Sequence, residues 1–84
     1  MEWRVIIDPH AEKDLDSLDW RTRERIVEAL FRLATNPLTA PNVKSLTGGG
    51  YRLRVGDYRV LYTLKNEILV VLVVKIGHRR EVYR

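Results

Sequence analysis

The stretch that most constrains the fold of this chain runs from residue 51 to residue 62, where two alternating segments flank the pair Gly56-Asp57. Such a pair is typical of a two-residue β-hairpin turn, because one or both central residues need a positive φ angle. The turn also sets the register of the two strands. The predicted cross-strand pairs are Val55 with Tyr58, Arg54 with Arg59, and Leu53 with Val60.

This register places Arg52, Arg54 and Arg59 on one face of the sheet. Arginine directly opposite arginine costs about 0.2 to 1 kcal/mol. One interpretation is that the guanidinium groups splay into water or pair with acidic groups elsewhere. The other is a phosphate cradle, because the planar guanidinium binds phosphate oxygens two at a time. We favour the anion-binding face.

The length and composition indicate one small domain spanning residues 1–84, with a single modest core. The chain has no cysteine, which excludes disulfides and thiolate metal sites and is compatible with a reducing compartment. The two histidines, His10 and His78, lie far apart without ligand-like spacing. We therefore expect neither a metal ion nor a cofactor.

The apolar segments are too short for a membrane protein. The longest, Ile68 to Val74, falls far below the roughly 18 residues of a membrane span. Charged Glu2, Arg4 and Asp8 interrupt any N-terminal secretion signal. We expect a soluble, cytoplasmic protein with no membrane partner.

The positive charge is concentrated in the C-terminal part of the chain. The first 50 residues carry seven basic and eight acidic residues, whereas the last 34 carry eight basic and three acidic ones, for a net charge of +4. A basic half on a near-neutral scaffold favours a polyanionic partner, and nucleic acid is the commonest of these.

The N-terminal half reads as one strand followed by two helices. Trp3 to Ile7 is rich in aromatic and β-branched residues and predicts a strand. Asp8-Pro9 predicts the start of a short helix with apolar residues at helical spacing. Asp19 predicts the cap of a second helix, which Asn36-Pro37 ends. Residues 37–50 read as a loop.

The C-terminal half reads as three strands. After the hairpin, Lys65 to Glu67 predicts a turn, and Ile68 to Ile76 predicts a strand that is apolar on both faces and hence the most buried. Gly77 is expected to interrupt it. The segment from His78 to Arg84 is expected to be a polar tail or short edge strand.

The resulting order β-α-α-β-β-β predicts an α+β domain, with two helices on one face of a mostly antiparallel sheet. If the helices cover the face that bears Leu53 and Val60, the opposite face presents the three arginines to solvent.

Arginine-rich faces suit metal-independent RNA cleavage. The reaction needs a base for the ribose 2′-hydroxyl, cations for the dianionic phosphorane and an acid for the leaving oxygen. Arginine supplies charge but is a poor base. The titratable candidates are His78, whose unperturbed pKa is about 6.5, and Tyr83, whose unperturbed pKa is about 10 and would need to be lowered by nearby arginines. His78 as a surface residue and Tyr83 as a packing or base-stacking residue are the alternatives.

Three segments together resemble the RelE/ParE superfamily of bacterial and archaeal toxins, and the resemblance extends over almost the whole chain. The segments are Gly50-Tyr51-Arg52-Leu53-Arg54, Gly56-Asp57-Tyr58-Arg59-Val60-Leu61-Tyr62 and Gly77-His78-Arg79-Arg80-Glu81-Val82-Tyr83.

Resemblance to the RelE branch implies a ribosome-dependent endoribonuclease that cuts mRNA in the aminoacyl site by attack of the 2′-hydroxyl on the adjacent phosphate. It also implies a cognate antitoxin. Position by position, the resemblance matches Arg52, Arg54, Arg59, Arg79 and Tyr83; with His78, which lies beside this set, these are the predicted catalytic residues. The predicted RNA-binding residues are Arg52, Arg54, Arg59, Lys75, Arg79 and Arg80.

Two other functions fit the same residues. A toxin of the ParE branch would bind DNA gyrase and poison it without being an enzyme. The C-terminal Arg79 and Tyr83 argue mildly against that branch. A plain RNA-binding or partner-binding module would also use the arginine face.

Overall fold

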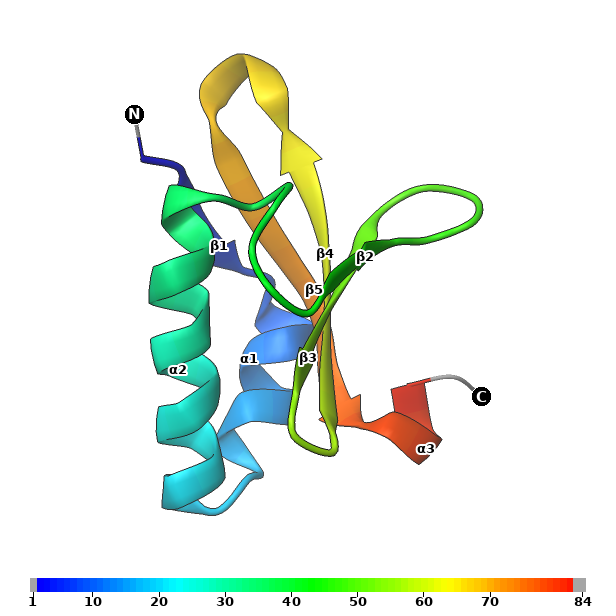
Figure 1. Cartoon of the computed structure of the whole chain (residues 1–84). Helices are drawn as coiled ribbons and strands as arrows, with labels where there is room; N and C mark the ends of the chain where they lie inside the picture. The colour runs from blue at the N-terminus through cyan, green and yellow to red at the C-terminus, as the bar shows by residue number, and fades with distance from the viewer. Residues whose placement is uncertain (1, 83–84) are drawn as a thin grey trace.

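Two helices cover one face of a five-stranded sheet in the computed structural model, which describes residues 2–82 (Figure 1). In chain order the elements are β1 (Arg4–Ile7), α1 (Pro9–Asp16), α2 (Trp20–Thr35), β2 (Val43–Ser45), β3 (Tyr51–Val55), β4 (Tyr58–Lys65), the 3-10 turn η1 (Asn66–Ile68), β5 (Val70–His78) and α3 (Arg79–Val82).

The strand order is β1-β5-β4-β3-β2, in which β1 runs parallel to β5 and every other pair is antiparallel. The predicted α+β class and the mostly antiparallel sheet are confirmed. The structure adds one short strand, β2, within the segment that was predicted to be a loop. The predicted hairpin register is confirmed at all three pairs, and Gly56 has the positive φ of +59° expected at the first central residue of a type II′ turn.

Both predicted helix caps are present. The Asp8 carboxylate accepts a hydrogen bond from the backbone N–H of His10 at 2.9 Å. The Asp19 carboxylate accepts from the hydroxyl of Thr22 at 2.6 Å and from its N–H at 3.3 Å, and these hydrogen bonds lower the pKa of Asp19. Asn36 ends α2, as predicted. No helix within residues 2–82 is long and apolar enough to cross a membrane.

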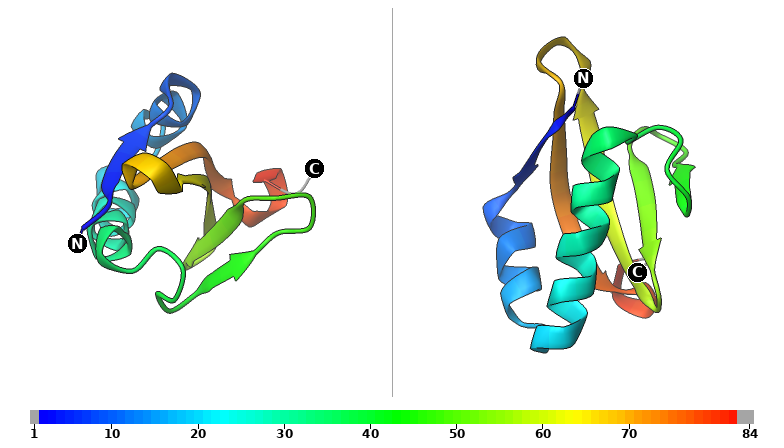
Figure 2. Two further views of the ribbon diagram at one scale, coloured as in Figure 1. Left: turned by 90° about the horizontal axis from the view of Figure 1, so that it is seen from above. Right: turned by 60° about the vertical axis from the view of Figure 1, so that its left-hand side comes forward.

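The core lies between the two helices and the sheet face that bears Leu53 and Val60, which are 4% and 0% exposed. Figure 2 shows α1 and α2 on this same face. Other buried residues of the core include Ala11, Leu15, Ile26, Leu30, Leu33, Val71, Val73 and Ile76. The arginines of β3 and β4 therefore lie on the other face, as predicted.

Strand β5 holds more buried residues than any other strand, as predicted, but its predicted ends are wrong. Ile68 belongs to η1 and is 64% exposed, and Leu69 has a left-handed φ of +52°, so the strand begins at Val70. A bulge opposite Leu61 and Tyr62 leaves Val74 without a cross-strand partner. This extra residue lets Val73 and Ile76 both face the helices.

Gly77 does not interrupt β5, because it pairs with Arg59 inside the strand. Its missing side chain instead makes room for the C-terminal segment: a Cβ at Gly77 would lie 3.2 Å from Cγ2 of Val82. The Arg79 N–H donates to the carbonyl of Asp57 at 2.9 Å. Residues 79–82 thus form the helical turn α3 rather than the predicted tail or edge strand, whereas Tyr83 and Arg84 lie outside the described residues.

Tyr62 anchors the loop after α2 to the sheet. Its ring is 1% exposed and stacks on Tyr51 with 5.5 Å between ring centroids. Its hydroxyl donates a 2.6 Å hydrogen bond to the carbonyl of Pro37. Burial, with a smaller contribution from Tyr51, raises the pKa of Tyr62 well above its usual value, so the hydroxyl remains a donor.

Tyr62→Phe should lower the free energy of unfolding by about 1–3 kcal/mol, because it leaves the Pro37 carbonyl without this donor. Tyr51→Phe is the matched control. The two rings are stacked, but the Tyr51 ring is only partly buried, so this change should stay within about 0.5 kcal/mol of the wild type. Urea denaturation measures the free energy of unfolding of both variants. Equal losses would contradict a stabilising role for the Tyr62 hydroxyl.

Gly77→Ala should loosen α3 while the sheet stays folded, because the new Cβ would lie 3.2 Å from Cγ2 of Val82, which must shift by a few tenths of an ångström. Trypsin should then cut after Arg79 or Arg80 faster than in the wild type, with a loss of global stability of about 1 kcal/mol or less. Thr47→Ala, in an exposed loop, should leave the cleavage rate unchanged. An unchanged rate in Gly77→Ala would show that α3 does not depend on this contact.

Candidate functional site

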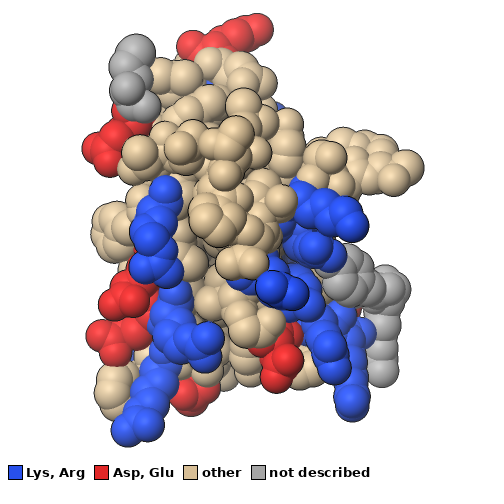
Figure 3. Space-filling model, viewed as in Figure 1, with Lys and Arg blue, Asp and Glu red and all other residues tan. Residues whose placement is uncertain are grey.

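The sheet face that α1 and α2 leave uncovered, here called the open face, is basic. Both the loop between β2 and β3 and the turn α3 project on this side of the sheet (Figures 1 and 2). Basic side chains gather on the same side in Figure 3, and a second group follows α2. The paired rows of the open face are Arg54, Arg59 and Gly77 near the hairpin turn, and Lys44, Arg52, Leu61 and Lys75 beyond it.

Arg54 and Arg59 face each other across β3 and β4, yet neither forms an ion pair with a described residue. Nη1 of Arg59 donates to the carbonyls of Gly56 and Tyr58 at 3.0 and 2.9 Å. Nη2 of Arg54 donates to Oδ1 of Asn42 at 3.2 Å. Neutral oxygens therefore hold both guanidinium groups, and within residues 2–82 no carboxylate cancels their positive charge.

Arg59 is the more enclosed member of this pair. Its Nε is buried and has no hydrogen-bond partner among the described residues. A buried donor without a partner costs free energy, and such groups in a folded protein point to strain or to a function. Arg52 is also half-buried, in the next row.

The other predicted basic residues lie around this pair. Lys75 is paired with Leu61 on the open face, and its Nζ lies 3.9 Å from Oδ2 of Asp14 on α1. Arg79 and Arg80 are exposed in α3, which packs against Gly77. The structure thus brings Arg52, Arg54 and Arg59 to the open face and places Arg79 and Arg80 at its C-terminal end, whereas the ammonium group of Lys75 reaches Asp14 on the helix side.

The structure does not bring His78 to Arg54 and Arg59 on the open face. His78 pairs with Tyr58, whose side chain packs against the core on the helix side of the sheet, and the two rings meet edge to face with 5.7 Å between centroids. Its Nδ1 accepts a hydrogen bond from the Arg80 N–H at 3.3 Å. Tyr83, the other predicted proton-transfer residue, lies outside the described residues. Within residues 2–82, no three His, Cys, Asp or Glu side chains are grouped so that they could hold a metal ion.

Comparison with known proteins supports one family. Residues 5–83 match the family described as ParE toxin of type II toxin-antitoxin system, parDE. The chain is similar to Toxin RelG of Mycobacterium tuberculosis, with 30% identity over all of this chain and 99% of that protein. The chain belongs to the RelE/ParE superfamily of toxins.

Solved structures of RelE toxins share the fold of this RelE/ParE toxin. The toxin-antitoxin complex RelBE2 from M. tuberculosis contains a chain with 30% identity and a TM-score of 0.85, and the match covers 94% of this chain and 100% of that one. The archaeal RelE-RelB complex from Pyrococcus horikoshii contains another, with 30% identity and a TM-score of 0.77, covering 94% and 97%.

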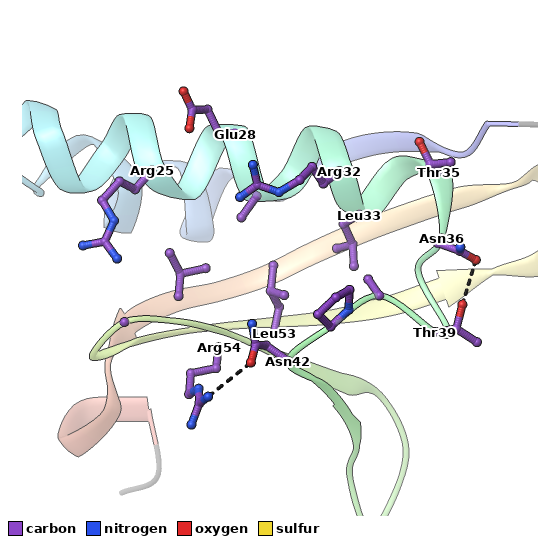
Figure 4. A pocket seen from close by; sticks show the side chains of 15 residues that line it. Arg25, Glu28, Arg32, Leu33, Thr35, Asn36, Thr39, Asn42, Leu53 and Arg54 are labelled. Atoms are coloured by element: carbon purple, nitrogen blue, oxygen red, sulfur yellow. Dashed lines mark hydrogen bonds between the residues drawn. The ribbon is translucent and has the colours of Figure 1, made fainter.

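A groove of about 630 Å³ separates α2 from β3 in this RelE/ParE toxin (Figure 4). Arg25 and Arg32 of α2 lie along one side, and Leu53 lies in its apolar floor. Arg54 of β3 also lines the groove, but its side chain points away from α2 toward Asn42. The groove lies on the helix side of the sheet and is therefore separate from the open face.

Sequence reasoning missed two residues of the site. Lys44 faces Arg52 only because β2 pairs with β3, and Asn42 reaches Arg54 for the same reason. The signal for both was weak, since β2 has three residues and lies between a proline-containing loop and three glycines.

Arg54→Gln should raise the free energy of unfolding by about 0.2–1 kcal/mol at low ionic strength, because it removes one of two facing like charges. The gain should shrink in about 1 M salt, where the Debye length is about 3 Å. Arg32→Gln removes the same charge from α2 and should show no such gain. Urea titrations at both salt concentrations measure this, and a loss of stability at low salt would contradict it.

Proposed function

We propose that this protein is the toxin of a toxin-antitoxin pair and acts as a metal-independent endoribonuclease that cuts mRNA on the ribosome. The observation that carries the proposal is the facing pair Arg54 and Arg59, whose charges no described carboxylate neutralises. The proposal places the protein in the cytoplasm, where its substrate is.

Similarity to proteins named RelE and RelG over nearly the full length supports the RelE branch. The similar solved chains are described in complexes with RelB antitoxins, which supports an antitoxin as the protein partner here. The basic open face supports the ribosome and mRNA as the other partners, because phosphate contacts dominate affinity for nucleic acid.

Arg59 would bind the scissile phosphate and stabilise its transition state. Attack of the 2′-hydroxyl on the adjacent phosphate places a second negative charge on the phosphorane, and preorganised cations stabilise it most where water is excluded. Arg59 suits this role, because it is half-buried and its Nε has a proton to donate. Arg52 and Arg54 would bind neighbouring phosphate oxygens, with Lys75, Arg79 and Arg80 along the RNA.

In this proposal Tyr83, rather than His78, takes the proton of the 2′-hydroxyl. The bond from phosphorus to the 5′-oxygen then breaks to leave a cyclic phosphate, and the leaving oxygen takes up a proton from water. His78 packs against Tyr58 on the helix side and accepts from the Arg80 N–H. Tyr83 is the next residue after Val82, which packs over Gly77 beside Arg59. A cation close to a tyrosine favours its deprotonated form and so makes it a better base.

Poisoning of DNA gyrase is the alternative, because the matching family description names ParE. It is not favoured, since the similar curated protein and the solved structures at 30% identity carry Rel names.

Arg59→Ala and Tyr83→Phe should each lower the rate of mRNA cleavage on purified programmed ribosomes by about 10²–10³, the usual cost of removing one group that stabilises or transfers charge in the transition state. Mapping the 5′ ends of the products by primer extension measures the rate. Arg32→Ala, on α2, should cleave at the wild-type rate.

Two outcomes would contradict this proposal. Full cleavage by both variants would remove the assigned residues from the site. Intact translation together with stabilised gyrase-DNA cleavage complexes would decide for the ParE alternative. Circular dichroism of Arg59→Ala separates lost chemistry from lost folding, because the Arg59 guanidinium also binds carbonyls of the hairpin turn.

A further inference from the structure

Asn42 contacts both ends of Arg54. Its backbone carbonyl accepts from the Arg54 N–H at 3.0 Å, and its Oδ1 accepts from Nη2 of the same arginine at 3.2 Å. Asn42 itself has a positive φ of +69°, which asparagine adopts more readily than most residues. Figure 4 shows the side-chain hydrogen bond on the side of β3 away from α2.

The position of this contact follows from the end of β2. The pairing of β2 with β3 stops at Val43 opposite Leu53, so Arg54 is the first residue of β3 beyond it. At that point Arg54 lies at the edge of the sheet, exposed and opposite Arg59. Without a partner, its long side chain would be free to move and would be repelled by the facing guanidinium.

We propose that Asn42 is a positioning residue that holds the Arg54 guanidinium on the open face and apart from Arg59, ready to bind a phosphate of the RNA. This inference rests on the proposed function. A neutral acceptor suits the role, because it occupies one of the five N–H donors of the arginine and leaves its charge available. A carboxylate in its place would compete with the phosphate as an ion-pair partner.

The role concerns binding rather than the chemical step. Arg54 is exposed and lies beside the more buried Arg59, so it would contact the RNA in the ground state and the transition state alike. Loss of such uniform binding raises KM and leaves kcat unchanged. If the Arg54 side chain is held by no partner and becomes ordered only when the RNA binds, binding should be weaker by about two- to tenfold.

Asn42→Gly is the direct test, because glycine keeps the positive φ and the backbone hydrogen bond but removes Oδ1. On programmed ribosomes we expect KM to rise by about two- to tenfold with kcat unchanged. In an Arg54→Ala background the same change should have no further effect, because the side chain that it positions is absent. An equal rise in both backgrounds, or none in the wild-type background, would overturn the proposal.

Asn36→Ala is the matched control. Asn36 lies in the same loop region, and its Oδ1 also accepts a side-chain hydrogen bond, from the hydroxyl of Thr39 at 2.8 Å. This change should lower stability without changing KM. A comparable rise in KM would show that loosening of the loop, rather than the contact with Arg54, is responsible.

A second readout does not depend on cleavage. In ¹⁵N NMR relaxation, the Arg54 side chain should be more ordered in the wild type than in Asn42→Gly. Equal mobility in the two proteins would overturn the positioning role even if the proposed nuclease activity holds. Ordered Arg54 in a wild type that cuts no RNA would instead contradict the proposed function alone.

Discussion

Burial of the Leu53–Val60 pair beneath the helices is the constraint on which the rest of the structure depends. Side chains alternate along a strand, so burying these two residues forces their neighbours Arg54 and Arg59 onto the opposite face. A register shift of one residue would place the arginines in the core and expose the apolar pair. The stability of the core and the charge of the open face are therefore set by the same pairing.

The facing arginines show how a small domain can hold like charges together. Their mutual repulsion is modest at a solvated sheet face, and burial of a single large apolar side chain contributes more, about 1.5–3 kcal/mol. Carbonyl and amide oxygens hold the two guanidinium groups in place without neutralising them. An anion that binds both would gain the attraction that no described carboxylate supplies.

Features that depend on neighbouring residues in the chain were predicted well from the sequence. The hairpin turn at Gly56, the caps at Asp8 and Asp19 and the end of α2 at Asn36 all follow from local preferences for φ or for a side-chain hydrogen bond. The arginine face followed as well, because hairpin register is a local property once the turn is known. The resemblance to RelE/ParE toxins then indicated the family.

What the sequence by itself determined is thus the hairpin, its arginine face and the two helices, since each depends on residues a few positions apart. Tertiary structure decided the rest. A glycine at position 77 is compatible with a strand that breaks there and with a strand that continues beneath α3. Only the contact with Val82 shows that the second arrangement is the one formed. His78 lies on the helix side because of its pairing with β4, and Asn42 meets Arg54 across a strand pair twelve residues apart in the chain. Such contacts depend on packing between distant segments, which no local preference encodes.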